Sequence, residues 1–122
     1  MTRSRLVAVA AGALFLAVPL TAAAQNAKAE QGAALFASQK CTMCHSVAGK
    51  GNPKGSLDNV ASTKKPDEIR QWIVDPEGMR AKANATRTPA MKALKLSTEQ
   101  VDALVAYLGS LKGPHAAGDA AR

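Results

Sequence analysis

Five consecutive residues constrain this chain more than any other feature, because Cys41-Thr42-Met43-Cys44-His45 contains both of its cysteines. Cys-x-x-Cys-His is the pattern of covalent haem c attachment. Thiols three residues apart lie on neighbouring turns of a helix, so each can add to one of the two vinyl groups on the same porphyrin edge. His45 follows at once and is placed to give a neutral imidazole nitrogen to the iron. The motif therefore predicts one covalent haem per chain, with His45 as a ligand.

Other uses of two such cysteines fit less well. A structural zinc site needs four Cys or His ligands, whereas this chain has two cysteines and two histidines, one of them His115 near the end. A thioredoxin-like dithiol belongs to a fold with βαβ units, and no strand pattern is present to build one. A disulfide at this spacing would close almost no loop and would add little stability.

A second axial ligand is a more open question, because three methionines follow the N-terminal segment. Met43 lies inside the motif, on the same side as His45, and cannot readily reach the opposite face of a haem. Met91 lies in an irregular stretch before the last predicted helix, from which a thioether could reach inward, and Met79 lies nearer the preceding helix. A lone methionine is more often adaptable core filler than a ligand. The residues alone favour Met91 over Met79 only slightly.

The N-terminus predicts export. Arg3 and Arg5 precede an apolar run, residues 6–20, which ends in small residues at 22–24, and cleavage is expected after Ala24. The run is too short for a spanning helix, which needs about 20 apolar residues. We therefore expect a signal peptide over residues 1–24, a domain over 25–112, a flexible tail over 113–122 and a periplasmic location. No membrane span is expected after cleavage.

Composition limits the partners of the mature chain. Cleavage would remove Arg3 and Arg5, which lowers the formal charge from +7 to +5. This charge indicates attraction to acidic partners. Nucleic acid is not expected, since the lysines are scattered and no aromatic stacking platform accompanies them. The remaining 98 residues hold few aromatic side chains, so a buried haem could help to fill the centre.

Helix signals predict a small, single-domain, all-α fold with three to five helices. A short helix is expected from about Gly32 to the motif, after a ragged start over residues 25–31. Pro66 opens a second helix, which Pro76 ends near Val74. The apolar face of this second helix is Ile69, Trp72 and Ile73.

The last helix has the clearest signals. Ser97 and Gln100 form a capping-box pattern, and Gly113-Pro114 is expected to stop the helix. Its apolar spacing runs through Val101, Leu104, Val105, Leu108 and Leu111. Residues 49–55 are expected to form an irregular loop. Residues 76–96 are expected to be mostly loop, with a helical turn or two from 79 to 85.

These residues resemble the class I cytochrome c family over about residues 32–111. The resemblance implies that the first and last helices pack crosswise, that the aromatic of the third helix covers the haem, and that Met91 is the distal ligand. It is carried by the attachment motif together with Gly32, Phe36, the Tyr107-Leu108 pair, the segment Trp72-Ile73-Val74-Asp75-Pro76 and Met91.

Two positions depart from the family pattern. The family commonly has Gly-Pro before the loop leucine, and the proline carbonyl accepts the proton of the proximal histidine, whereas this chain has Lys54-Gly55-Ser56-Leu57. A hydrogen bond from His45 to the Gly55 carbonyl is therefore a hypothesis here. Lys92 replaces the proline that often follows the ligand methionine, so the ligand loop is less constrained.

With both axial positions filled, the iron has no open site for a substrate, and we expect a monomeric one-electron carrier rather than an enzyme. Electron transfer requires brief docking near the haem edge. Lysines flanking the ligand segments are candidates for this contact: Lys40, Lys50 and Lys92, extended by Lys54, Lys64, Lys65 and Lys95. Two alternatives remain, a haem subunit of a larger periplasmic oxidoreductase complex and a five-coordinate haem that binds gas or substrate.

Overall fold

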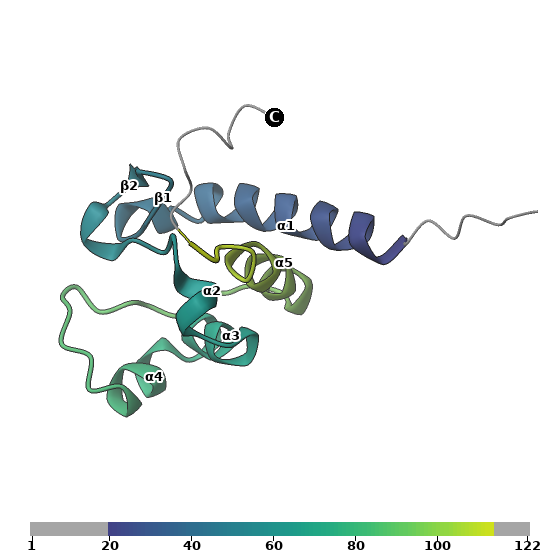
Figure 1. The fold of residues 1–122 in the computed structure, drawn as a ribbon. Coiled ribbons are helices and arrows are strands. Elements are labelled where there is room, and N and C mark those ends of the chain that lie inside the picture. Colours follow the sequence, from purple (N-terminus) through teal and green to yellow (C-terminus); the bar gives the residue numbers. More distant parts are fainter. Residues whose placement is uncertain (1–19, 114–122) are drawn as a thin grey trace, which may run out of the picture.

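The computed structural model describes residues 20–113 (Figure 1). Most of the predicted signal segment, the predicted tail and His115 lie outside the described residues. The elements run in the order α1 (Leu20–Ser38), η1 (Cys41–Met43), β1 (Ser46–Val47), β2 (Lys50–Gly51), η2 (Pro53–Gly55), α2 (Val60–Thr63), α3 (Pro66–Val74), α4 (Pro76–Lys82) and α5 (Thr98–Leu108). The predicted small all-α fold is confirmed.

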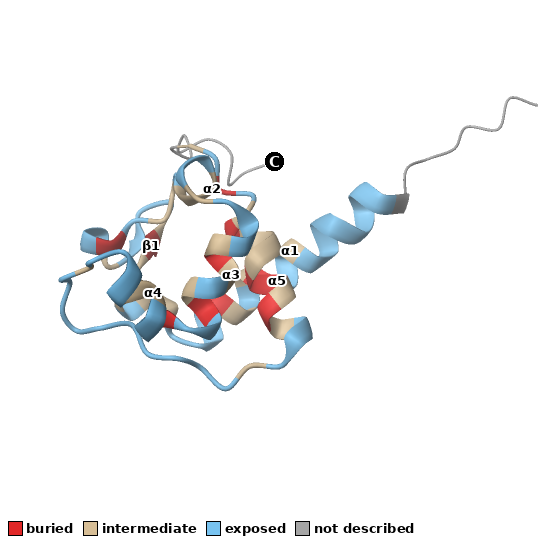
Figure 2. Cartoon of the chain, turned by 90° about the horizontal axis from the view of Figure 1, so that it is seen from below, coloured by how far each residue is buried: buried red, intermediate tan, exposed pale blue. Residues whose placement is uncertain are grey.

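The core lies where α1, α3 and α5 meet, and the N-terminal half of α1 extends away from it (Figure 2). At the crossing of α1 and α5, Gly32 is buried, and a Cβ placed on it would stand 2.6 Å from the Cβ of Tyr107 and still closer to the Ala103 carbonyl oxygen. Phe36, one turn on, meets Tyr107 edge to face with ring centroids 5.7 Å apart. The absence of a side chain at Gly32 therefore lets α1 and α5 pack this closely. The buried cluster consists of Phe36, Ile69, Ile73, Val101, Leu104, Leu108 and Leu111.

Local signals set the bounds of α3 and α5. The second predicted helix begins at Pro66 and ends at Val74, as expected. In α5, the Ser97 side chain accepts from the Gln100 backbone and the Gln100 side chain accepts from the Ser97 backbone, so the capping box is present. The helix ends at Leu108 rather than at Gly113, and Leu111 is buried from the turn beyond it. That part of the prediction was wrong, because helical spacing continued past the residue where the helix stops.

An ion-pair cluster joins the three core helices at their solvent edge. Asp102 on α5 accepts a hydrogen bond from the Arg70 guanidinium on α3, and the Lys28 ammonium on α1 lies 3.9 Å from its other oxygen. The Arg70 hydrogen bond, assisted by the charges of Arg70 and Lys28, lowers the pKa of Asp102. These side chains are partly exposed, and such pairs contribute little beyond fixing orientation.

Two expected irregular stretches are ordered instead. Residues 25–31 belong to α1, because alanine and other good helix formers dominate there. Within residues 49–55 lie β2 and η2. Ala48 and Gly49 both have positive φ, 51° and 74°, and form the two-residue turn that pairs Val47 with Lys50. The short helix α2 was not predicted either.

The remaining long segment, residues 83–97, has no regular secondary structure. The helical turns expected at 79–85 begin three residues earlier, as α4, because Pro76 starts the helix and the Asp75 side chain accepts from the Gly78 amide. In Figure 1 the segment 83–97 leaves α4, turns back and runs on to α5. Among the described residues, no helix is long and apolar enough to cross a membrane.

Gly32→Ala tests the crossing of α1 and α5. Alanine favours a helix over glycine by about 1 kcal/mol, but overpacking against a backbone carbonyl, which cannot rotate aside, outweighs this. The free energy of unfolding, measured by urea titration of the haem-loaded protein, is expected to fall by at least about 1 kcal/mol. Ala34→Leu, on the exposed side of α1, serves as the control and should change it by less than about 0.5 kcal/mol. Equal effects of the two substitutions would contradict the close crossing.

Candidate haem-attachment site

The motif folds as a tight turn immediately after α1. Lys40 adopts a left-handed conformation with φ of 57°, which ends α1 and starts η1. The Cys44 and His45 amides both donate to the Cys41 carbonyl, at 3.1 and 2.9 Å. Side chains three residues apart in a 3₁₀ turn lie on the same side. The two cysteines are therefore brought together by a 3₁₀ turn rather than by the α-helical turns that the sequence predicted.

Both thiols are free and partly buried. Cys41 packs against the core cluster, and burial, with a smaller contribution from Cys44, raises its pKa. Met43, between them, is 70% exposed. This places the Met43 side chain on the surface, which agrees with its exclusion as a distal ligand.

The ring of His45 is held by one hydrogen bond. Its Nδ1 lies 3.1 Å from the Gly55 carbonyl oxygen. Because a carbonyl only accepts, Nδ1 carries the proton and Nε2 has the free lone pair. The hypothesis that Gly55 supplies this carbonyl is confirmed.

The electrostatics favour a neutral ring. Burial lowers the pKa of His45, the Gly55 carbonyl opposes that shift, and the charge of Arg87 adds to it. His45 is therefore neutral at pH 7, which is the form that binds a metal.

Asn52 was missed by sequence reasoning, although its hydrogen bonds hold the loop after the motif against the motif itself. Its backbone N–H donates to the carbonyls of Thr42 and His45, both at 3.0 Å. Its side-chain nitrogen donates to the Met43 carbonyl at 3.2 Å. Gly51 beside it has φ of 111°, and a Cβ there would collide with the His45 carbonyl. Asn52 therefore ties the proximal loop to the motif. A Gly-Asn-Pro run just after the motif was the available signal.

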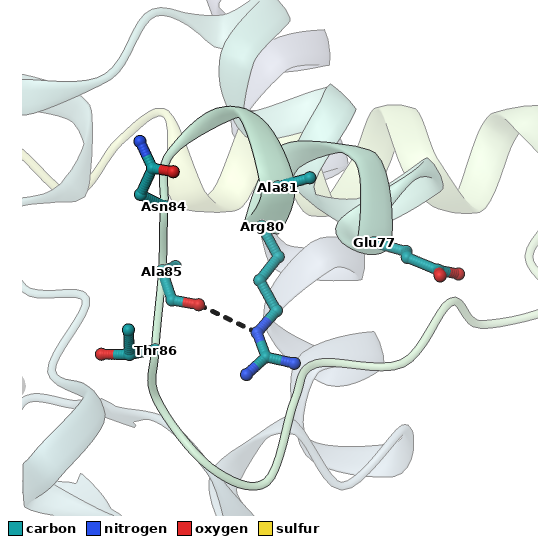
Figure 3. A pocket seen from close by; sticks show the side chains of 6 residues that line it. All are labelled: Glu77, Arg80, Ala81, Asn84, Ala85 and Thr86. Atoms are coloured by element: carbon teal, nitrogen blue, oxygen red, sulfur yellow. Dashed lines mark hydrogen bonds between the residues drawn. The ribbon is translucent and has the colours of Figure 1, made fainter.

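The candidate methionines lie on other elements. Met79 is in α4 and Met91 in the segment 83–97, where 39% of Met91 is exposed. The start of this segment is fixed by Arg80, whose carbonyl accepts from the Ala85 amide at 3.0 Å. The Nε of Arg80 also donates to the Ala85 carbonyl at 2.9 Å (Figure 3). The structure thus brings Cys41, Cys44 and His45 together in one turn, with Met91 on a different segment.

Comparison with known proteins gives the family. The cytochrome c family model matches residues 29–112. The chain belongs to the cytochrome c family. Its cofactor is accordingly haem c, covalently bound, with iron.

A curated relative, cytochrome c oxidase subunit 2 of Alkalihalophilus pseudofirmus, is 30% identical over 93 residues, which cover 69% of this chain and 26% of the relative. The cytochrome therefore spans about a quarter of the length of that relative. No solved structure matches the present chain.

The residues present fit a haem. The donor set of two thiols and a neutral imidazole suits thioether attachment and iron ligation. In addition, the indole Nε1 of Trp72 on α3 is buried and has no hydrogen-bond partner in the part of the chain that the structure describes. Buried donors are normally paired, and the carboxylates of a haem would supply an acceptor. Between residues 20 and 113, no group of three or more His, Cys, Asp or Glu side chains could hold a metal ion.

Gly55→Ala tests the support of His45. Gly55 is buried, and a Cβ would collide with the Cys44 carbonyl and with the Arg87 guanidinium. The loop must shift, so the free energy of unfolding of the haem-loaded cytochrome is expected to fall by about 1 to 3 kcal/mol. Lys54→Ala, at the exposed neighbouring position, is the control. An unchanged midpoint for Gly55→Ala in chemical denaturation would show that the loop has no such constraint.

Proposed function

We propose that Cys41 and Cys44 hold the haem through thioether bonds, that His45 and Met91 are its axial ligands, and that the chain carries single electrons. The observation that carries the proposal is the hydrogen bond of 3.1 Å from His45 Nδ1 to the Gly55 carbonyl, beside two free thiols. It fixes the tautomer that leaves Nε2 for the iron. The assignment of Met91 is supported by the family resemblance and by its place in a segment without regular secondary structure.

The haem iron supplies a one-electron couple between ferric and ferrous states. The residues of this chain set its surroundings: His45 is oriented by Gly55, and Cys41 packs against the core cluster. A thioether from Met91 would leave no open position for a substrate and would favour the ferrous state. This argues for a carrier rather than an enzyme.

An optical spectrum tests the ligands. The mature protein, made with the haem-attachment machinery, is expected to keep its haem after denaturation and to show the weak near-infrared band of a sulfur-to-iron bond. Met91→Ala should abolish this band, whereas Met79→Ala, the control, should preserve it. Loss of haem on denaturation would overturn the attachment. A band that survives Met91→Ala but not Met79→Ala would reassign the distal ligand.

The proposal includes export to the periplasm. Its support is the N-terminal pattern of two arginines, an apolar run and small residues up to Ala24. The family is typically exported, and the helices of the described residues include no membrane span. The predicted cleavage point lies within α1, so the mature chain would begin inside this helix.

Docking is assigned to basic side chains near the motif and near Met91 in the sequence, extended by Lys64 and Lys65, with acidic redox proteins as partners. Lys40, Lys50, Lys54, Lys65, Lys92 and Lys95 are exposed. Lys64 differs, since its ammonium is 2.8 Å from the Glu68 carboxylate. Met43 is exposed three residues after Lys40 and adds an apolar side chain to the proposed docking surface.

Reduction by an acidic flavodoxin is expected to slow as ionic strength rises, because salt screens the attraction. Lys40→Gln should reduce the low-salt rate, and Lys64→Gln, the control with its charge already paired, should reduce it less. Stopped-flow mixing over a range of salt measures both. Rates independent of salt would contradict electrostatic docking.

A haem subunit of a larger oxidoreductase is the second candidate. The relative from Alkalihalophilus pseudofirmus favours it, since that protein is an oxidase subunit in which the matching part is only a fraction of the length. A free carrier would be monomeric after gentle purification, whereas a subunit would sediment with its complex.

A further inference from the structure

Gly55 contacts His45, Cys44 and Arg87, and the contact with Arg87 is not accounted for by the proposed haem ligands. Its carbonyl holds His45, and the space beside its Cα is filled by the Cys44 carbonyl and by both terminal nitrogens of the Arg87 guanidinium. Gly55 is buried, whereas Arg87 is exposed. The guanidinium therefore covers the residue that orients the histidine ring.

Arg87 reaches this position from far along the chain. Its Nη2 donates to the Cys44 carbonyl at 2.5 Å, across 43 residues. The cation belongs to the segment 83–97, which has no helix or strand of its own. Arg87 is thus a link between the segment that contains Met91 and the turn that contains His45.

Arg80, the other arginine near this segment, makes a different contact. Arg80 is committed to the Ala85 carbonyl at the start of the same segment, as Figure 3 shows. The two arginines therefore have different roles. Arg80 holds the start of the segment 83–97 against α4, and Arg87 connects the same segment to the turn that contains Cys44.

We propose that Arg87 is a positioning residue for His45. Its guanidinium holds the Cys44 carbonyl and packs on Gly55, which keeps the Gly55 carbonyl on His45 Nδ1. The inference rests on the proposed function, since it takes His45 as an iron ligand. A guanidinium suits this task because its planar fork can donate to a carbonyl and lie against a glycine at once, which an ammonium cannot do.

The test is the rate at which the Nδ1 proton of His45 exchanges with water, measured by NMR on the reduced, haem-loaded protein. Each opening of the contact with Gly55 exposes this proton, so the rate reports local opening. Arg87→Gln is expected to accelerate exchange by about tenfold, the factor that matches the loss of one hydrogen bond. Arg87→Lys should fall between wild type and Arg87→Gln, because it restores the charge without the fork.

Two controls separate positioning from simple destabilisation or loss of charge. Lys82→Gln removes an exposed cation from the end of α4 and should leave exchange unchanged. Gly32→Ala weakens the whole fold at the crossing of α1 and α5 but leaves the contacts of Arg87 in place, so it should accelerate exchange less than Arg87→Gln does.

If Arg87→Gln exchanges no faster than Lys82→Gln, or if Gly32→Ala accelerates exchange equally, the positioning role is overturned. Failure of the proposed function would look different, because the His45 signals would then lack the shifts of an iron-bound imidazole even in the wild type. That result would overturn the positioning role as well.

Discussion

The close crossing of α1 and α5 at Gly32 is the contact on which the site depends. The motif begins only three residues after the last residue of α1, so the position of α1 on the core also sets the position of both thiols. Cys41 packs on the same cluster as Phe36 and Leu108. A side chain at Gly32 would push the helices apart and would move the attachment turn with them. Core packing and haem geometry are therefore one constraint in this fold.

Beyond the crossing, the proximal side is held by hydrogen bonds rather than by regular secondary structure. Asn52 binds three backbone groups of the motif, and Gly55 binds the ring of His45. Glycines at 51 and 55 allow the loop backbone to approach the motif as closely as these bonds require. A loop of two-residue strands and a 3₁₀ turn thus becomes rigid enough to fix an imidazole tautomer.

Sequence reasoning succeeded where structure follows from neighbouring residues. Pro66 and the Ser97–Gln100 capping box marked the starts of α3 and α5 correctly, since a fixed φ and a local hydrogen bond act within one turn. It failed where the local structure is set by contacts between residues far apart in the sequence. The short helix α2 is hydrogen-bonded to the turn that follows α5, through the Ala61 amide to the Leu111 carbonyl at 3.0 Å, and no local pattern encodes that contact. Arg87 was missed for the same reason.

The departure from the family at Gly55 follows from this long-range contact. A proline there would lack the amide that donates to the Asn52 carbonyl at 3.1 Å, and its ring would need the space that Arg87 occupies. Proline makes a carbonyl rigid by fixing its own φ. Glycine cannot do this, so rigidity has to come from what packs against it. In this chain that support comes from the segment that also contains Met91, and the two sides of the proposed haem site are therefore mechanically joined.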